Sequence, residues 1–466
     1  MSVLVATLGL AFLMILAYRG FSVIMAAPIA ALISIMLINP ALVAPVFSGI
    51  YMEKMVFFMK LYFPVILLGA VFAKLNELAG FSEAIVVATI RYIGQSRANT
   101  VIVTACALLT YGGVSTFVVV FAVYPFAAEL YRQANIPKRL MPGALALGSF
   151  SFTMDALPGS PQISNIIPTT FFKTTSWAAP VLGVIGSIFI VAAGLTLLEW
   201  RRRIAMRSGE GYGTGHINEP ERTDTMTLPP ALLAAAPLIV VVVGNFCFTE
   251  LIPKWYGTSV TVSPQRLPGL HSPLTLSVSS VVALWAIEAA LICGIVLVAA
   301  TAFRRVRERF AAGTRAAVSI ALLATVNTAS EFGFGSVIAM LPGFFLVSHA
   351  LKEISNPLVN AAVSVSTLAG ITGSASGGIS IALAVLSDQL IKGAQAAHVP
   401  LEVLHRVVSM ASGGMDTLPH NGAIITLLAV TGLTHRQSYR EIFVITIIKT
   451  VAVFFVIGLY YVTGWV

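Results

Sequence analysis

The sequence predicts an all-α polytopic membrane protein built from two inverted repeats. Its 466 residues are 57% hydrophobic and only 10% charged, with a mean hydropathy of +0.91. Apolar runs of about 20 residues, the length of a membrane span, recur along the chain. The net charge of +9 is concentrated in arginine clusters at the ends of apolar runs, as in 199–207 and 303–310. This distribution is typical of cytoplasmic loops, so we expect membrane lipid and no nucleic acid as a partner.

The apolar runs divide the chain into two halves of similar plan. The first repeat, 1–199, has scaffold spans at 3–18, 21–39 and 54–79, an interrupted region at 98–172 and a last span at 177–199. A polar linker follows at 200–228. The second repeat, 229–466, has scaffold spans within 229–346 at 229–249, 278–303 and 316–346, an interrupted region at 358–431 and a last span at 440–463. The amino-terminal run lacks the basic segment and cleavage site of a signal peptide, so it is expected to be the first span.

Three markers recur in the two interrupted regions in the same order. The motif Met-Asp-x-Leu-Pro occurs at Met154–Pro158 and again at Met415–Pro419. Upstream of the two copies lie YGGVST (111–116) and SGGISI (376–381), and the breakers NIP (135–137) and HVP (398–400) fall between. Near-constant spacing of three markers predicts an internal repeat.

The repeat also predicts the topology. If each interrupted region is a re-entrant hairpin followed by one broken span, each half crosses the membrane five times. This gives about ten spans plus two hairpins, and the odd number inverts the second half. Placing the linker 200–228 in the cytoplasm puts most arginines inside and satisfies the positive-inside bias. Both termini are then periplasmic, in the inner membrane, and the two hairpins enter from opposite sides.

Paired breaks at membrane depth indicate a binding site near the bilayer midplane. Non-helical backbone is tolerated there only when it is buried or lines a water-filled cavity. The amides at the N-termini of half-helices can hold an anion. The candidate substrate-binding residues of the hairpin tips are Gly112, Gly113, Ser115, Thr116, Thr372, Ser374, Ser376, Gly377, Gly378 and Ser380. Those of the broken spans are Asp155, Ser160, Gln162, Asn165, Asp416, His420 and Asn421.

Each candidate also has a purely structural interpretation. Glycine- and serine-rich tips are equally typical of close helix packing, although their paired arrangement favours a site. Asp155 and Asp416 are as well suited to capping a half-helix as to handling substrate or protons. His420, which Gly159 replaces in the first repeat, is either a proton carrier or a neutral ligand. The candidates for proton coupling are Asp155, Asp416, His420 and Glu331. Glu77, which occupies roughly the place of Glu331 in the first repeat, is expected to pair with Lys74.

Few basic residues lie near the predicted breaks. Lys173 and Arg406 are the nearest, and both are expected at the membrane interface. A carboxylate would then be held by amide dipoles and hydroxyls, a mode that suits one negative charge better than three. The acidic residues and histidine favour a proton as the coupling ion, and a sodium ion is the alternative.

The motifs MDALPGSPQISNIIPTTFF and SMASGGMDTLPHNGAIITLLAVTGLTHRQSY resemble those of the gluconate permease family of proton-coupled organic-acid carriers, within the ion-transporter superfamily. The similarity covers the whole chain. The gluconate-transporting members carry a His-Val-Asn-Asp-Ser-type motif where Leu418 to Gly422 stand here, and this sequence is more similar to the branch for 3-hydroxybutyrate and related short monocarboxylates. The resemblance implies a homodimer in which hairpins and broken helices move as an elevator against a scaffold.

The predicted function is therefore symport of a small hydroxy-monocarboxylate with protons, by a protein that is not an enzyme. No cofactor and no metal are expected. A channel, which conducts without accumulation, is one alternative. A membrane-embedded enzyme is another, but its usual motifs, such as HExxH, are not evident.

Overall fold

A computed structural model describes residues 5, 8, 9, 11–13, 15, 16, 19, 22–220, 228–265, 271–341, 354–419 and 421–466. The first predicted span, 3–18, lies largely outside the described residues, and so does His420. In the described part of the first half, the helices are α2 (Val23–Ile38), α3 (Val43–Val46), α4 (Met52–Ala79), α5 (Phe81–Ile93), α6 (Ala98–Tyr111), α7 (Thr116–Gln133), α8 (Met141–Ser149), α9 (Phe152–Asp155), α10 (Ile163–Phe172) and α11 (Pro180–Arg207).

The second half also consists mainly of helices over its described residues. Its helices are α12 (Ala231–Tyr256), α13 (Val282–Thr301), α14 (Phe303–Val306), α15 (Phe310–Met340), α17 (Pro357–Thr372), α18 (Ala375–Ala396), α19 (Leu401–Gly414), α20 (Gly422–Thr431) and α21 (His435–Thr463). A 3₁₀ turn, η6 (Met415–Thr417), separates α19 from α20. Among the described residues, six helical segments are long and apolar enough to cross a membrane, so the expected polytopic helical fold is confirmed.

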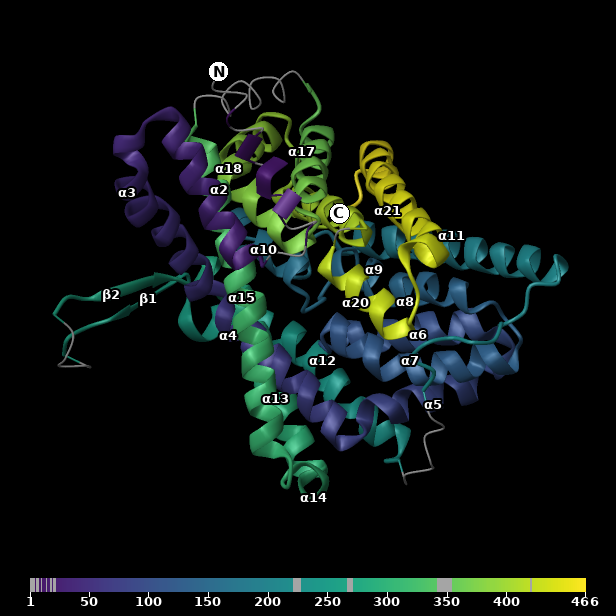
Figure 1. Cartoon of the computed structure of the whole chain (residues 1–466). Helices are drawn as coiled ribbons and strands as arrows, with labels where there is room; N and C mark the ends of the chain where they lie inside the picture. Colours follow the sequence, from purple (N-terminus) through teal and green to yellow (C-terminus); the bar gives the residue numbers. More distant parts are fainter. Residues whose placement is uncertain are drawn as a thin grey trace.

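Three local features differ from the sequence prediction. A two-stranded antiparallel ribbon, β1 (Ser259–Val262) with β2 (Leu274–Ser277), joins α12 to α13 and projects from the helical body (Figure 1). Helix α5 was not predicted as a separate element; it starts anew because α4 ends at Gly80, which has a φ of 74°. Helix α11 continues to Arg207, so the first residues of the predicted linker 200–228 are helical.

Both interrupted regions consist of a helical hairpin followed by a broken span. The hairpins are α6 with α7 and α17 with α18, and both tips turn at a glycine with positive φ, 96° at Gly113 and 65° at Gly373. The broken spans are α8 and α9 followed by α10, and α19 followed by α20. Non-helical residues separate their parts, and each Met-Asp-x-Leu-Pro motif begins in the short helical turn before such a loop, α9 in the first span and η6 in the second.

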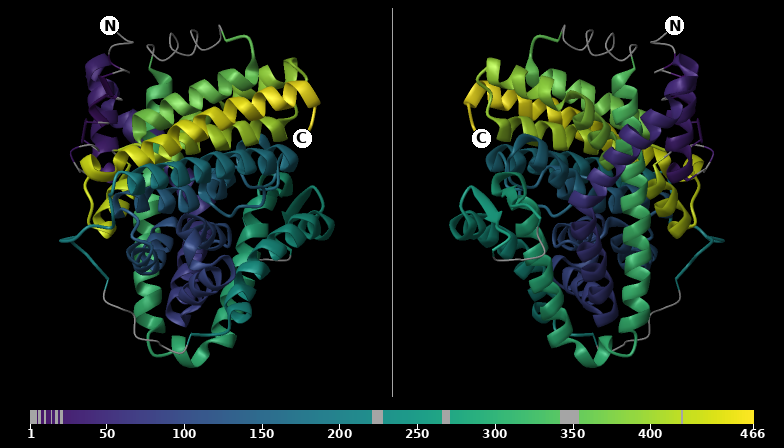
Figure 2. Two further views of the ribbon diagram at one scale, coloured as in Figure 1. Left: turned by 90° about the vertical axis from the view of Figure 1, so that its right-hand side faces the viewer. Right: turned by 90° about the vertical axis from the view of Figure 1, so that its left-hand side faces the viewer.

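The two halves are packed into one another. Helix α10 of the first half packs on α18 of the second, and α20 of the second half packs on α7 of the first. Helices α11 and α21 lie antiparallel (Figure 2). At one end the Val181 amide donates to the Val466 carbonyl over 3.3 Å, and near the other Arg201 pairs with Glu441 at 2.6 Å. Each broken span is therefore held by elements of the opposite half.

Beside this group, four long helices pack mainly on one another. Helix α15 lies along α4, α13 lies against both α4 and α12, and α15 also touches α18. Aromatic rings fill the α4–α15 contact, where Phe58 and Phe332 have ring centroids 5.7 Å apart. These helices form a wall against which the hairpins and broken spans rest.

The segment after α11 is tied across the ends of several helices. Arg139 donates two hydrogen bonds to Glu210, at 2.5 and 2.7 Å, and Lys138 pairs with Glu219 at 2.6 Å. The side-chain amide of Asn218 donates to the Ala429 carbonyl in α20 at 2.8 Å. We call residues 208–219 the strap, because they connect the end of α11 to the first hairpin region and to the second broken span.

The Arg139–Glu210 contact makes the strap sensitive to acid. The hydrogen bonds from Arg139 hold the pKa of Glu210 below its usual value of 4.5. A lowered folded-state pKa means that the contact stabilises the strap above pH 4.5 and is lost as the pH falls through the lowered pKa. Hydrogen exchange over residues 208–219, corrected for intrinsic rate, should therefore rise with acid, and Glu210→Gln should raise it severalfold at neutral pH.

The matched control for this prediction is Glu199→Gln. Glu199 pairs with Arg202 and Arg203 on its own helix and touches no strap residue through these pairs. Loss of the Glu199 charge should leave hydrogen exchange over residues 208–219 unchanged, since exposed ion pairs within a helix contribute little to stability. Equal exchange in the two variants would contradict the assigned role of Glu210.

Candidate functional site

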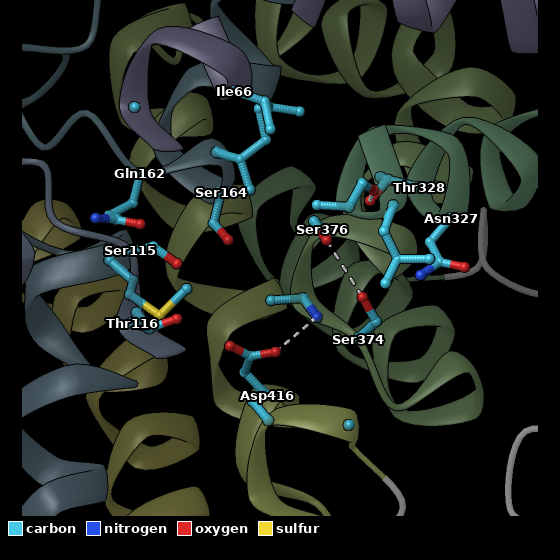
Figure 3. A pocket seen from close by; sticks show the side chains of 18 of the residues that line it. Ile66, Ser115, Thr116, Gln162, Ser164, Asn327, Thr328, Ser374, Ser376 and Asp416 are labelled. Carbon is cyan, nitrogen blue, oxygen red and sulfur yellow. Dashed lines mark hydrogen bonds between the residues drawn. The ribbon is translucent and has the colours of Figure 1, made fainter. Parts of the chain in front are cut away.

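A cavity of about 770 Å³ lies where the hairpin tips and the two breaks meet the wall of long helices (Figure 3). The wall contributes apolar side chains, including Val65 and Ile66 from α4 and Leu291 from α13, together with Asn327 and Thr328 from α15. The opposite side is polar and comes from the two interrupted regions. Among the described lining residues there is no lysine, arginine or histidine.

The N-termini of four half-helices converge on this cavity. Helices α7, α10, α18 and α20 each have their first residue, or the residue just before or after it, in the cavity lining. The preceding residues are Ser115, Gln162, Ser374 and Asn421. A helix N-terminus presents unpaired N–H groups and partial positive charge, so four of them around one space create a site for an anion without any basic side chain.

The first hairpin tip is fastened to the first break by hydrogen bonds to backbone. Gln162 Nε2 donates to the Thr110 carbonyl at 2.8 Å, and the Tyr111 hydroxyl donates to the Pro158 carbonyl at 2.8 Å. Neither Ser115 nor Gln162 makes a side-chain cap hydrogen bond to the helix that it precedes. The amides at the starts of α7 and α10 are therefore not capped by these side chains.

Asp416 performs the corresponding connection in the second half. Its Oδ1 accepts from the Ala375 amide at 3.1 Å and from Asn421 Nδ2 at 2.8 Å, and it thereby links the second hairpin tip to the second break. Asn421 Oδ1 in turn accepts from the Ala423 amide and caps α20. Asp416 lines the cavity, and its Oδ2 has no hydrogen-bond partner among the described residues.

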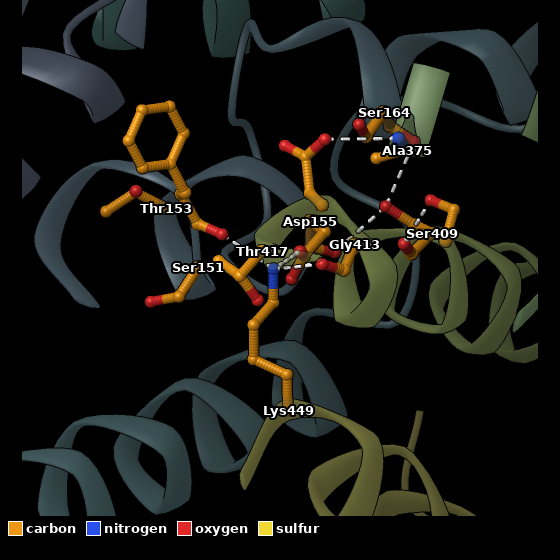
Figure 4. A network of polar contacts seen from close by, with 12 residues as sticks. Ser151, Thr153, Asp155, Ser164, Ala375, Ser409, Gly413, Thr417 and Lys449 are labelled. Carbon is orange, nitrogen blue, oxygen red and sulfur yellow. Dashed lines mark hydrogen bonds and ion pairs between the residues drawn. The ribbon is translucent and has the colours of Figure 1, made fainter. Parts of the chain in front are cut away.

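Asp155, the counterpart of Asp416 in the repeat, lies in a different environment. It is 1% exposed and forms an ion pair with Lys449 of α21, at 3.1 Å between Nζ and Oδ2 (Figure 4). Lys449 also donates to the carbonyls of Phe150, at 2.6 Å, and Gly413. A Cβ on Gly413 would overlap the Asp155 carboxylate, so the glycine makes room for this contact. Asp155 does not line the cavity.

The two aspartates differ because the helices of the second half carry cations that those of the first half lack. Helix α11, the last helix of the first half, has no lysine or arginine before Arg201, and α8, which precedes the first break, has none. Consequently, no counterpart of Lys449 or Arg406 approaches Asp416 from these two helices. One aspartate of the pair is neutralised by a buried lysine, whereas the other faces the cavity.

Arg406 is not at the membrane interface, and that expectation is wrong. It is fully buried and donates to the carbonyls of Ala178, at 2.7 Å, and Asp155, at 3.0 Å, and to Asn165 Oδ1 at 3.0 Å. The first break exposes the Asp155 carbonyl, the loop before α11 exposes that of Ala178, and the guanidinium has enough donors to serve both. Lys173, by contrast, is exposed.

The predicted site residues separate into two groups. Those in the cavity lining are Gly113, Ser115, Thr116, Gln162, Glu331, Thr372, Ser374, Ser376, Asp416 and Asn421. Those outside the lining are Gly112, Asp155, Ser160, Asn165, Gly377, Gly378 and Ser380. The second group makes internal contacts: Ser160 donates to the Thr153 carbonyl, Asn165 to the carbonyls of Ser160 and Ser176, and Ser380 to the Ser376 carbonyl.

Sequence reasoning missed Ser164, Asn327 and Thr328 in the lining and Lys449 beneath it. Two signals were available. Asn327 and Thr328 precede Glu331 by four and three residues, which places them on its face of a helix. Lys449 stands alone in an apolar span, where an ionisable residue indicates a partner or a function.

Glu77 forms its expected ion pair with Lys74, at 2.5 Å. Among the described residues, no cluster of three His, Cys, Asp or Glu side chains could hold a metal ion.

A curated relative decides the class. The chain is 52% identical over 475 residues to YxjC of Bacillus subtilis (strain 168), which is described as an uncharacterized transporter, and the match covers 100% of both chains. The chain belongs to the family of this transporter. No protein-family model matches it. Among solved structures, the YdaH transporter of Alcanivorax borkumensis has a similar fold, with a TM-score of 0.55 over 88% of each chain at 12% identity. The protein is thus a multi-pass membrane transporter.

Proposed function

We propose that the protein is a secondary active symporter of a small hydroxy-monocarboxylate, such as 3-hydroxybutyrate or gluconate, with protons. The observation that supports it most is the convergence of four half-helix N-termini on one cavity. Such termini bind a carboxylate through amides and hydroxyls. Because the described lining holds no basic side chain, the site suits a single negative charge. The cations Arg406 and Lys449 are engaged with backbone carbonyls and Asp155 and do not line the cavity.

Coupling to protons follows from the acidic residues in the same cavity. Glu331 and Asp416 both line it. An anion entering beside two ionised carboxylates in a poorly hydrated space would be repelled, since Coulomb interactions are strong where the dielectric constant is low. Protonation of these groups removes the repulsion, so uptake of the anion and of protons is linked. A sodium ion could neutralise the same charge and is the alternative coupling ion.

The remaining architecture is proposed by extension from the gluconate permease resemblance. The hairpins and broken spans would move together as an elevator against the wall of α4, α12, α13 and α15, in a homodimer. The two halves would be inverted repeats of five spans, in the inner membrane with both termini periplasmic. The antiparallel packing of α11 and α21 and the crossed contacts of α10 and α20 support the inverted relationship.

Reconstituted proteoliposomes test the proposal. Under an inward proton gradient they should accumulate labelled 3-hydroxybutyrate or gluconate, and a protonophore should abolish the accumulation. A sodium gradient at equal pH on both sides should not drive it. Accumulation of neither acid contradicts the proposed substrate class, accumulation driven by sodium alone contradicts proton coupling, and conductance without accumulation indicates a channel.

A further inference from the structure

Glu331 has a carboxylate in the cavity that has no partner among the described residues. The residue is only 5% exposed and lies in α15, on the wall side of the cavity. Its side chain makes no hydrogen bond and no ion pair with any described residue. Most buried carboxylates are paired, because an unpaired charge away from water is costly. A carboxylate in a cavity with no partner among the described residues is therefore free to accept one from outside the chain.

This carboxylate rests against the first turn of α18. A Cβ built on Gly377 would overlap Glu331 Oε2, so the carboxylate occupies the space that a side chain would take at this position. One turn further along α15, a Cβ built on Gly335 would overlap the side chain of Ile381 of α18. The two glycines let α15 and α18 approach closely. The carboxylate of Glu331, which belongs to the wall, therefore lies against the tip of the second hairpin.

The same turn of α18 retains free hydrogen-bond donors. The Ala375 amide donates to Asp416, the Gly377 amide to Ser374 Oγ and the Gly378 amide to the Ser374 carbonyl. The remaining amide of the turn, that of Ser376, has no acceptor among the described residues. The hydroxyls of Ser374 and Ser376 lie 3.3 Å apart beside it in the cavity lining (Figure 3). These donors at the first turn of α18 could hold an anion, and we call them the anion-binding end of α18.

We propose that Glu331 is a tethered carboxylate that blocks the anion-binding end of α18 while it is ionised, and that it must take up a proton before the carboxylate of the substrate can bind there. This inference rests on the proposed function. It adds a mechanism of coupling, in which proton and substrate are linked because the internal and the external carboxylate compete for the same end of one helix. Since the acid belongs to α15 and the donors to the second hairpin, its protonation also changes the electrostatic interaction between the wall and the hairpin.

The charged surroundings of Glu331 are consistent with this exchange. The titratable groups that face it are Asp416 from η6 and Tyr51 from the turn before α4. Helix α2, which also packs on α15, carries no charged residue, and α18 has none before Asp388. No described cation in the lining can hold Glu331 in its ionised form, so a proton is the simplest neutralising partner.

The test compares Glu331→Gln with the wild type in proteoliposomes, and Glu77→Gln serves as control because Glu77 is the paired counterpart in the first half. Glu331→Gln should still exchange labelled for unlabelled 3-hydroxybutyrate but lose accumulation under a proton gradient. In the wild type the apparent affinity should weaken by about tenfold for each pH unit above the titration of Glu331, and in the variant it should be independent of pH. Loss of exchange in a folded Glu331→Gln protein, or an unchanged pH dependence, would overturn the proposal.

Infrared spectroscopy gives a second measurement that needs no substrate. On acidification the wild type should develop a carboxylic-acid carbonyl band that is absent from Glu331→Gln. Absence of a Glu331-dependent band would overturn the proposal even if transport is observed. If the wild type transports neither acid, the proposed function fails, and the band alone decides whether Glu331 takes up a proton. If Glu331→Gln does not fold, Glu331→Asp is the second variant, because its shorter side chain withdraws the carboxylate from Gly377. This variant should keep the carboxylic-acid band but show a weaker pH dependence of substrate binding. A pH dependence as strong as that of the wild type would contradict the competition between the two carboxylates.

Discussion

Replacing Asp416 by asparagine should reduce proton-driven uptake to background while the protein still folds and inserts. The substitution keeps the shape of the side chain and an acceptor oxygen for the Ala375 amide, but it removes the charge that faces the cavity. Asn421→Ala should have the same effect on transport. It removes the donor to Asp416 and the cap of α20, and loss of such a cap costs about 1 kcal/mol, too little to unfold a large domain.

The control for both variants is Asp388→Asn. Asp388 is exposed, lies further along α18 and is not in the cavity lining. Its uptake should equal that of the wild type. For all three variants, the amount of protein in the membrane and the elution of the purified protein as a folded species should be measured alongside uptake. Near-normal transport by both Asp416→Asn and Asn421→Ala would exclude the second break from the substrate site.

Lys449→Met should be the most destabilising of the substitutions considered. It leaves the buried Asp155 carboxylate without its cation and removes the donor from the carbonyls of Phe150 and Gly413. Removal of one partner of a buried ion pair typically costs about 3–5 kcal/mol. Thermal or denaturant unfolding of the purified protein in detergent, compared with wild type, would measure the loss.

A double variant separates charge from packing in this prediction. Asp155→Asn with Lys449→Met removes both charges, so it should recover part of the stability that Lys449→Met alone loses. Lys392→Met, at an exposed position of α18, is the matched control and should leave stability unchanged. If Lys449→Met is as stable as the wild type, the ion pair is not what holds the first break.

The breaks could be located from the sequence because they have a local cause. The prolines of the two Met-Asp-x-Leu-Pro motifs and Gly113 of the first tip lie in non-helical backbone, as predicted. The second tip differs, because Gly377 and Gly378 lie inside α18 and the chain turns at Gly373 instead. The half-helix starts at Ser115, Ser374 and Asn421 are within the same short stretches, so candidates chosen there fall in the cavity lining.

Tertiary contacts decide what the sequence left open. Asn165 and Gln162 are three residues apart and were indistinguishable as candidates, yet Asn165 turns toward the carbonyls of the first break while Gln162 reaches the cavity. Arg406 was misplaced for the same reason. Its partners are more than two hundred residues away in the chain, and a local pattern contains no information about them. The different roles of Asp155 and Asp416 likewise depend on a lysine in the last helix.

The crossed packing of the two halves has a consequence for biosynthesis. A ribosome delivers the first half to the membrane well before α19 and α21 exist. Until then, the carbonyls that Arg406 serves and the carboxylate that Lys449 neutralises must remain hydrated or find temporary partners, because hydrocarbon provides none. The nascent first half therefore cannot mature alone. Its final folding requires that α19 and α21 have been inserted.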